Sequence, residues 1–372
     1  MRVLFDDQIF RNQNFGGISR YFANVISRLK NFDNIKILPS KIYSKNIHLF
    51  EHSLSKYGLL QNTPHFRGKS RIDNFFIENQ KNNIKKTLSS GKYEIYHPTY
   101  YDTEFLDHNI YDKPFVLTVH DMIHELYYDK IHNKIHQETI NKQILIPKAA
   151  HIIAVSEYTK QDILKLYPYI NENKISVVYH GSTIINITKT QNINENYLLF
   201  VGNRTDYKNF NWLIISLRPY LIQTGIKLLC AGSNKFTAEE IELINSLGLK
   251  KYIFHKLIED DQILYNLYRN AICFIYPSLY EGFGIPILES FASNCPVILC
   301  MASCFPEIAE DGALYYENNN SDQLLTQIQR IRTDKQLRTK MIALGNKRLA
   351  FFSWDRTVKI HKDIYLNCIE NP

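Results

Sequence analysis

Short apolar runs rich in β-branched and aromatic residues alternate with longer segments of helical periodicity along the whole chain. This alternation is typical of parallel β-sheets whose strands are joined by helices that cover the sheet faces. Two sets of similar runs therefore predict an α/β fold with two Rossmann-like domains. The runs that predict strands are Val3–Phe5, Ile35–Leu38, Glu94–His97, Phe115–Val119, Ile152–Val155 and Ser176–Tyr179 in the first set, and Tyr197–Val201, Lys227–Cys230, Tyr252–His255, Ile272–Tyr276, Val297–Leu299 and Ala313–Tyr315 in the second.

The boundary between the two domains is expected in Ile185–Asn196, a polar stretch rich in Asn and Thr without amphipathic periodicity. A chain of 372 residues also fits two domains of ordinary size. We expect domains at residues 1–185 and 186–352. In such a pair the carboxyl ends of both sets of strands face one another across a cleft, where ligands bind.

Composition favours a folded globular chain, because 45% of the residues are hydrophobic and 22% are charged. No apolar run has the length of a membrane span, and Asp6 and Asp7 interrupt the start before a signal-peptide core could form. We therefore expect a cytoplasmic protein. The 6 cysteines lie in the second half without a C-x-x-C pair, which predicts buried, reduced thiols.

The positive charge is concentrated near the amino end, where residues 1–100 hold 16 Lys and Arg against 7 Asp and Glu. Its densest part is Arg67–Arg71, followed by Phe75–Ile77 and by Lys81, Lys85 and Lys86 on an expected helix. Such a helix can lie on an anionic membrane surface or meet an anionic acceptor. The alternative is a solvated helix with a buried apolar face. Nucleic acid is less favoured, since no zinc-finger or RNA-binding signature accompanies the charge.

The segment Tyr276–Glu289 is the most informative for chemistry. A buried strand is expected to end at Tyr276, the turn Gly282-Phe283-Gly284 lets backbone approach a ligand closely, and Pro286 suits the first turn of the next helix. The exposed N–H groups of that helix terminus form a site for phosphate.

Two carboxylates flank this turn. Glu289 lies in the first turns of the expected helix, where it can accept two hydrogen bonds from a vicinal diol such as a ribose. Glu281 lies on the open turn and can reach a second group of hydroxyls. The alternative is that both acids only cap the helix.

A second cluster, Phe200–Asn209, closes the first strand after the expected boundary. Arg204 and Lys208 follow Gly202 there, so both cations can converge on one anion, and a diphosphate matches their geometry. The alternative is surface solubility. No Asp-x-Asp pair occurs in the chain, so we expect no metal at the diphosphate and assign its charge neutralisation to Lys and Arg.

Adjacent glycines, Gly16 and Gly17, precede an amphipathic helix at the amino end and can approach phosphate, although an ordinary loop is an equal alternative. The G-x-G-x-x-G spacing is absent from the whole chain, which argues against a dinucleotide oxidoreductase.

Histidines end two of the expected strands of the first domain. His120 closes Phe115–Val119 and is expected to point into the cleft; His97 ends another strand and either lines an acceptor pocket or packs in the core. The pairs His120/His124 and His132/His136 have the i, i+4 spacing of metal ligands but lack the His-Glu-x-x-His pattern, so no metal is expected.

Together these residues resemble the retaining glycosyltransferases of family 4, which have the GT-B fold, over nearly the whole chain. Pro277–Glu289 is similar to the family's E-x7-E signature. The resemblance implies that Glu289 holds the donor ribose, that Glu281 contacts the donor sugar, and that Arg204 and Lys208 grip the diphosphate.

The resemblance extends to both ends of the chain. It implies that Gly16-Gly17 approaches the phosphates, that His120 lies near the transferred sugar, and that a closing helix at 353–372, after Phe352-Ser353-Trp354, crosses back to the first domain. One departure is Asn294, which stands where the family has Gly; Asn can adopt the same left-handed conformation.

The resemblance implies a metal-independent, retaining hexosyltransferase with a nucleotide-sugar donor and no other cofactor. The best match is to bacterial enzymes of surface polysaccharide and O-antigen assembly. This favours mannose from GDP-mannose and a saccharide acceptor, which we expect to be lipid-linked. Alternatives are a UDP- or dTDP-sugar donor, a GT-B-fold nucleotide-sugar epimerase, or a non-catalytic sugar-binding protein. The nucleotide base is expected around Lys256–Glu259.

Overall fold

The computed structural model describes residues 1–57, 69–108, 113–129, 134–182, 197–204, 206–232, 234–258 and 260–371. The chain forms two compact units. One consists of Met1–Gly181 together with Trp354–Pro372, and the other consists of Ser182–Ser353. The stretch Ile185–Asn196, in which we expected the boundary, lies outside the described residues.

The predicted strands are confirmed, because each of the twelve runs overlaps a strand whose ends differ by at most two residues. In the first unit they form two parallel three-stranded sheets, of order β2-β1-β3 and β4-β5-β6. A bridge between Tyr96 and Phe115 joins β3 to the segment that leads into β4. The bounds are β1 Arg2–Phe5, β2 Lys36–Leu38, β3 Ile95–His97, β4 Val116–Val119, β5 His151–Ala154 and β6 Ile175–Val177.

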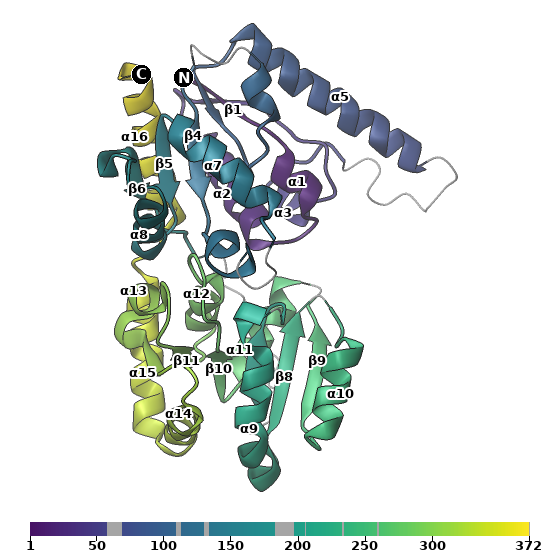
Figure 1. Cartoon of the computed structure of the whole chain (residues 1–372), viewed down its shortest axis with the longest axis vertical. Coiled ribbons are helices and arrows are strands. Elements are labelled where there is room, and N and C mark those ends of the chain that lie inside the picture. Colours follow the sequence, from purple (N-terminus) through teal and green to yellow (C-terminus); the bar gives the residue numbers. More distant parts are fainter. Residues whose placement is uncertain are drawn as a thin grey trace. The chain divides into compact units, whose positions relative to one another are not determined.

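Helices of very different length surround these sheets, and α5 is the long helix at the edge of the unit (Figure 1). The helices are α1 Gln8–Asn12, α2 Gly17–Leu29, α3 Ile47–Glu51, α5 Lys69–Ser90, α7 Gln137–Lys148, α8 Glu157–Leu166 and α16 Trp354–Glu370, with short helical turns at Glu104–Asp107, His124–Tyr128 and Glu172–Lys174.

The last helix, α16, belongs to the first unit and packs against α2. The Tyr365 hydroxyl lies 2.6 Å from His97 Nδ1, at the end of β3, and the Thr357 hydroxyl donates to the Tyr179 carbonyl at 2.7 Å. Buried hydrogen bonds of this kind fix the register of a helix that is otherwise held by apolar packing.

The second unit contains one parallel six-stranded sheet of order β12-β11-β10-β7-β8-β9. Its strands are β7 Tyr197–Val201, β8 Lys227–Gly232, β9 Ile253–Leu257, β10 Cys273–Tyr276, β11 Val297–Cys300 and β12 Ala313–Tyr316. Every residue of β7, β10 and β11 is buried. Continuous apolar runs of this kind form the central strands of parallel sheets, which are covered on both faces.

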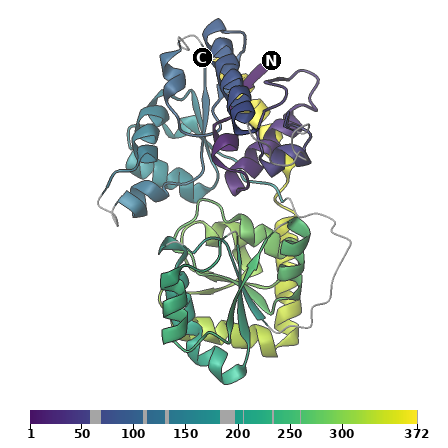
Figure 2. The ribbon, with the colours of Figure 1, turned by 90° about the vertical axis from the view of Figure 1, so that its right-hand side faces the viewer.

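Helices lie on both faces of this sheet (Figure 2). They are α9 Phe210–Thr224, α10 Ala238–Ser246, α11 Asp261–Asn270, α12 Ile285–Ala292, α13 Phe305–Ala309, α14 Ser321–Thr333 and α15 Lys335–Leu349, with short turns at Asp206–Lys208 and Glu310–Gly312.

Two local predictions are also confirmed. Asn294, after α12, has φ 54°, the left-handed conformation that its place at the end of the helix requires. All 6 cysteines are buried and free.

Candidate active site

The strand order of the second unit reverses between β7 and β10, which are neighbours in the sheet although far apart in the sequence. Strands β8 and β9 extend to one side of β7, and β11 and β12 lie beyond β10 on the other. In open α/β sheets, ligands bind beside the carboxyl ends of the strands at such a reversal. The segments after Val201 and after Tyr276 both start at this edge of the sheet.

Lys208 lies in the short turn after β7, and its side chain is 11% exposed. Its ammonium group donates hydrogen bonds to the Glu281 carboxylate and to the Tyr276 hydroxyl, the latter at 3.2 Å. Burial, and then the charge of Glu281, raise the pKa of Tyr276. The hydroxyl therefore stays protonated at neutral pH.

Glu281 is held at the start of the turn that follows β10. Its backbone N–H donates to the Ser303 hydroxyl at 3.1 Å, and its carboxylate is 14% exposed. The pair is thus nearly but not completely removed from solvent. A partly buried cation of this kind interacts strongly with an incoming anion, because water screens it poorly.

The turn ends at Gly284, which precedes α12 with φ 85° and offers no side-chain cap to the helix. A Cβ at this position would lie 3.1 Å from Ile287 Cδ1 and 3.3 Å from Phe305 Cε1. The positive φ therefore favours glycine, and a Cβ would fit only if the side chains of Ile287 and Phe305 shifted slightly. Pro286 lies in the first turn of α12, as predicted.

Phe283 has a structural part in this turn. Its ring is buried and lies 5.8 Å, edge to face, from the ring of Phe352. The prediction that the Gly282-Phe283-Gly284 turn approaches a ligand therefore depends on its backbone, because the phenylalanine ring packs inward.

Glu289 is the fifth residue of α12 and is buried. The Tyr268 hydroxyl of α11 lies 3.2 Å from Glu289 Oε2. This tyrosine was not predicted from the sequence. Two helices thus position a carboxylate that can accept hydrogen bonds from a diol.

Arg204 is held in a different network from Lys208. Its Nε donates to Glu240 at 2.7 Å, and one Nη donates to the carbonyls of Asn234 and Lys235 at 3.0 and 2.8 Å. Its guanidinium also lies 4.9 Å from the centre of the Phe236 ring. These contacts hold Arg204 through Nε and one Nη of its guanidinium group. That Arg204 and Lys208 bind the same diphosphate stays a prediction.

Glu240, which was not predicted as a site residue, links Arg204 to the start of α10. Its Oε2 accepts from the Thr237 N–H at 2.7 Å, and the Thr237 hydroxyl accepts from the Glu240 N–H at 3.2 Å. This reciprocal pair is a capping box. The T-x-x-E spacing could have indicated the start of the helix. It could not have indicated that Glu240 pairs with Arg204, 36 residues away.

Gly202 follows β7 and has φ 125°, a conformation that favours glycine. A Cβ at the neighbouring Gly232 would lie only 2.7 Å from the Gly202 carbonyl oxygen. The ends of β7 and β8 therefore approach closely just before the chain leads to Arg204.

Three predicted residues, Gly16, Gly17 and His120, belong to the first unit. Gly16 immediately precedes α2 and Gly17 is its first residue. Tyr21, one turn further along, packs edge to face on His120 with ring centres 5.2 Å apart. Within this unit the structure thus brings the glycine turn and the histidine to the same region.

His120 is buried, and burial lowers its pKa to about 3, with a further contribution from Lys142. The ring is therefore neutral at physiological pH. Its Nε2 has no hydrogen-bond partner among the described residues. A neutral imidazole nitrogen can form a hydrogen bond with a polar group without a charge being brought with it.

His97, in contrast, has both ring nitrogens within hydrogen-bond distance of side chains, at 2.6 Å from the Tyr365 hydroxyl and 2.9 Å from the Thr118 hydroxyl, and it is fully buried. Of the two readings of this histidine, core packing is therefore the correct one.

Some of the remaining predictions concern residues that the structure does not describe. In that part there is no group of three or more His, Cys, Asp or Glu side chains that could hold a metal, and no helix is long and apolar enough to cross a membrane. Thr205, His132, Arg67, Gly68 and, in the expected base pocket, Glu259 lie outside it. Lys256 and Leu257 of that pocket form the exposed end of β9.

Comparison with protein families gives two matches that together extend over both units. Residues 156–348 match the model described as glycosyl transferases group 1, and residues 15–182 match the model described as glycosyltransferase family 4.

Two curated relatives are similar in sequence. An uncharacterized glycosyltransferase of Methanocaldococcus jannaschii is 26% identical over 306 residues, which is 76% of this chain and 77% of the relative. The O-antigen chain mannosyltransferase RfbU of Salmonella typhimurium is 31% identical over 172 residues, which is 46% of this chain and 47% of that protein.

Among solved structures, sucrose-phosphate synthase of Thermosynechococcus elongatus matches with a TM-score of 0.75 over 100% of this chain and 99% of that one, at 17% identity. A likeness at this identity shows the fold alone, which is the α/β GT-B fold predicted from the sequence.

Proposed function

The chain belongs to the glycosyltransferases of group 1 and family 4, and on this premise we propose that it moves mannose from GDP-mannose to a saccharide acceptor with retention of anomeric configuration. The observation that carries this proposal is the Lys208–Glu281 pair at the strand reversal, beside the uncapped start of α12. A cation and backbone N–H groups suit a diphosphate, and a carboxylate suits the hydroxyls of a sugar.

In the proposed reaction Lys208 and Arg204 stabilise the negative charge that grows on the departing diphosphate. Such charge stabilisation is usually the largest single contribution to catalysis. The bond between the anomeric carbon and the phosphate oxygen breaks first, and the sugar becomes oxocarbenium-like. The acceptor oxygen then bonds to the anomeric carbon on the face that the diphosphate leaves, and its proton passes to the released phosphate oxygen.

The remaining site residues bind the donor in this proposal. Glu289 accepts hydrogen bonds from the ribose, and Glu281 contacts the sugar once the phosphate has taken over its partner Lys208. Backbone at Gly202, Gly282 and Gly284 allows close approach of the diphosphate. His120 and the Gly16-Gly17 turn are assigned to the transferred sugar and the phosphates, respectively.

The choice of mannose is supported by the Salmonella relative, which is named as an O-antigen chain mannosyltransferase. The donor is tested by incubating the protein with GDP-mannose, UDP-glucose or a dTDP-sugar and a mannose-terminated oligosaccharide, and by measuring product and free nucleotide. GDP-mannose should give the fastest transfer. Transfer from UDP- or dTDP-sugars alone would contradict the assignment of the donor.

The same transfer assay tests stereochemistry and metal dependence. The proposal expects an α-linked product from the α-linked donor, seen in the anomeric coupling of its NMR spectrum, and an unchanged rate in excess EDTA. A β-linked product would contradict retention. An altered sugar that forms without any acceptor would instead favour an epimerase.

The acceptor is proposed to be lipid-linked and to be reached at a membrane surface. Helix α5 exposes Phe75 at 67% and Phe76 at 42%, on a helix that also carries Lys69, Arg71 and Lys86. Apolar and cationic side chains on one helix are typical of segments that bind anionic bilayers. Flotation with anionic vesicles should recover the protein at low salt and less at high salt; no recovery in either would contradict this contact.

A further inference from the structure

Tyr276 joins the two charged residues at the strand reversal of the second unit. Its hydroxyl accepts a hydrogen bond from the Lys208 ammonium group at 3.2 Å and donates one to the Glu281 carboxylate. Lys208 also donates to Glu281 directly. The three side chains therefore form a closed ring of hydrogen bonds. One hydroxyl contacts both the cation assigned to the diphosphate and the carboxylate assigned to the sugar.

Packing holds the ring of Tyr276 in place. The residue ends β10 and is 1% exposed. Its ring centre lies 5.3 Å from that of Phe274, on the same strand, and 4.9 Å from that of Phe305, at the start of α13. A tyrosine side chain turns about two bonds, whereas lysine has a flexible four-carbon stem. The hydroxyl is therefore the fixed partner and the ammonium group the movable one.

A bound diphosphate would separate the ion pair. Lys208 would turn toward the phosphate, and Glu281, whose side chain is 14% exposed, would lose its cation. A nearly buried carboxylate without a partner is costly. Because an ammonium group has three N–H donors, Lys208 can keep its hydrogen bond to Tyr276 while it binds phosphate. The tyrosine O–H can at the same time keep its hydrogen bond to Glu281.

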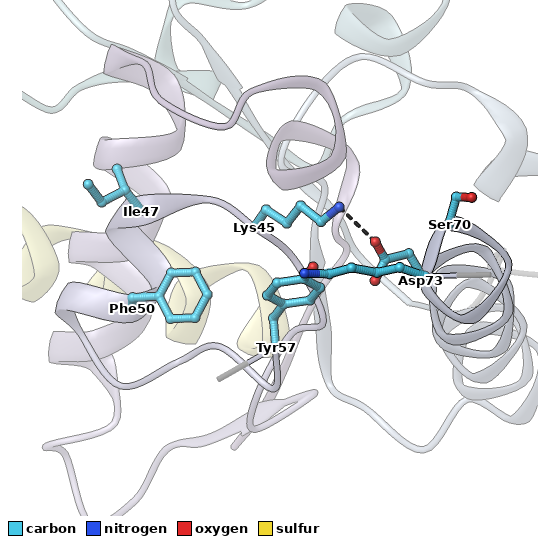
Figure 3. Close-up of a pocket in the computed structure, with 7 residues that line it drawn as sticks. Lys45, Ile47, Phe50, Tyr57, Ser70 and Asp73 are labelled. Atoms are coloured by element: carbon cyan, nitrogen blue, oxygen red, sulfur yellow. Dashed lines mark ion pairs between the residues drawn. The ribbon is translucent and has the colours of Figure 1, made fainter. Parts of the chain in front are cut away.

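A second lysine–carboxylate pair, in the first unit, shows why burial matters here. Lys45 lies 2.7 Å from Asp73 (Figure 3), and the Tyr43 hydroxyl donates to the same carboxylate at 2.8 Å. The Lys45 side chain is 53% exposed, so water competes for it and can replace a partner that leaves. The Lys208 side chain is only 11% exposed, so its orientation depends on protein groups.

We propose that the Tyr276 hydroxyl is a positioning group for the transfer reaction, which keeps Lys208 directed at the leaving diphosphate and Glu281 at the sugar after the donor has separated the two. Tyr276 acts through these residues and does not touch the substrate. Stabilisation of developing charge depends on groups that are already oriented before the reaction. This role depends on the proposed function, but the contact of the hydroxyl with both residues does not.

Tyr316 supplies a matched control. It is a buried tyrosine of the same sheet, on β12, and its ring stacks on that of Trp212 with the centres 5.6 Å apart. Its hydroxyl has no hydrogen-bond partner in the part of the chain that the structure describes. Tyr316→Phe therefore removes a buried hydroxyl, as Tyr276→Phe does, without breaking a hydrogen bond. It should leave the transfer rate unchanged.

The kinetic test is transfer from GDP-mannose by the full chain, with thermal unfolding as the check that each variant folds. Tyr276→Phe should lower kcat about tenfold, as loss of a hydrogen bond to a charged group does. The donor KM should change less than about threefold, because the hydroxyl supports charge stabilisation that is strongest in the transition state. In a Lys208→Ala background, Tyr276→Phe should lower kcat less than about threefold, because its effect passes through Lys208.

Three kinetic results would overturn the proposal. One is an equal kcat for the wild type and Tyr276→Phe. Another is a rise in the donor KM with an unchanged kcat, which would assign the hydroxyl to ground-state binding only. The third is an equal loss of kcat in both backgrounds, which would show that Tyr276 acts independently of Lys208.

A second measurement uses the wild type and needs no turnover. The ¹⁵N-labelled ammonium signal of Lys208, identified by its absence from Lys208→Ala, should move when inorganic diphosphate is added and should keep its NOE to the ring of Tyr276. Loss of that NOE on addition of diphosphate would overturn the proposal. Failure of the proposed function looks different: the wild type would transfer no sugar, or its Lys208 signal would not respond to diphosphate.

Discussion

The ammonium group of Lys208 donates a hydrogen bond to the carboxylate of Glu281, which joins the segments that follow two adjacent strands, β7 and β10. The two residues are 73 positions apart in the sequence. Their charges balance, so a bound diphosphate would compete with Glu281 for the same cation. Binding of the donor is thus expected to convert an internal ion pair into contacts with phosphate and sugar.

Replacing Lys208 with Ala should reduce turnover of the nucleotide sugar by roughly 10²–10³, the effect of removing one group that stabilises developing negative charge. Steady-state rates at saturating donor measure this. Lys250→Ala, which removes an exposed lysine of the same unit, should leave the rate unchanged. Equal rates for the wild type and Lys208→Ala would rule out the assigned role.

Glu289→Ala should chiefly weaken donor binding, because a carboxylate that accepts two hydroxyl hydrogen bonds in a buried place contributes about 1.5–3 kcal/mol. The dissociation constant of GDP should therefore rise by roughly ten- to a hundredfold. Glu242→Ala, which removes an exposed acid of α10, is the control. An unchanged affinity for GDP in the Glu289 variant would show that the ribose binds elsewhere.

Glu240 is predicted to position Arg204. Glu240→Ala should raise the KM for the donor more than it lowers kcat, since the released guanidinium can still reach the phosphate but is no longer oriented. Glu240→Gln keeps an acceptor for Arg204 Nε and should recover most of the loss.

The capping box supplies the control for this prediction. Thr237→Ala breaks the same cap but leaves Arg204 paired with Glu240, so it should cost about 1 kcal/mol of folding stability and leave the donor KM unchanged. If Thr237→Ala raised the KM as much as Glu240→Ala, the role of Glu240 would be structural only.

Acid should destabilise the first unit through its buried histidines. Burial lowers the pKa of His120 to about 3 and that of His361 to about 4, and it holds the pKa of His97 and His180 well below the usual value. The unfolded chain takes up protons below about pH 6.5, the ordinary histidine pKa, and the folded chain does not. Stability is therefore complete above that pH and is lost as the pH falls from about 6.5 toward 4.

Each such histidine should lower the free energy of unfolding by about 1.4 kcal/mol for every pH unit below about 6.5. Urea unfolding at several pH values between 7.5 and 5 measures this slope. His361→Phe should reduce the change in the free energy of unfolding per pH unit by the contribution of one proton. It also removes the 2.8 Å hydrogen bond with Tyr21. A slope that is identical in the variant would show that His361 takes up its proton at the same pH in the folded and the unfolded chain.

The positions of the strands could be predicted from the sequence because buried parallel strands are continuous apolar runs. Tyr197–Val201 is the clearest case, since every residue of this run is buried. The conformations at Gly284 and Asn294 were also predictable, because few residue types adopt positive φ without strain.

The partners of the charged residues were not predictable in the same way. Lys208–Glu281 and Arg204–Glu240 are contacts between segments that the sheet order brings together, and sequence spacing carries no information on that order. Tyr268 and Tyr276 were missed for the same reason: in the sequence each belongs to an apolar pattern, and only the packing shows that its hydroxyl meets a carboxylate or an ammonium group.

A crystal structure of the full chain with bound GDP tests the central claim most directly. The account predicts that the diphosphate lies against Lys208, Arg204 and the start of α12, with the ribose hydroxyls on Glu289. GDP seated away from the ends of β7 and β10, with the Lys208–Glu281 pair intact, would contradict it.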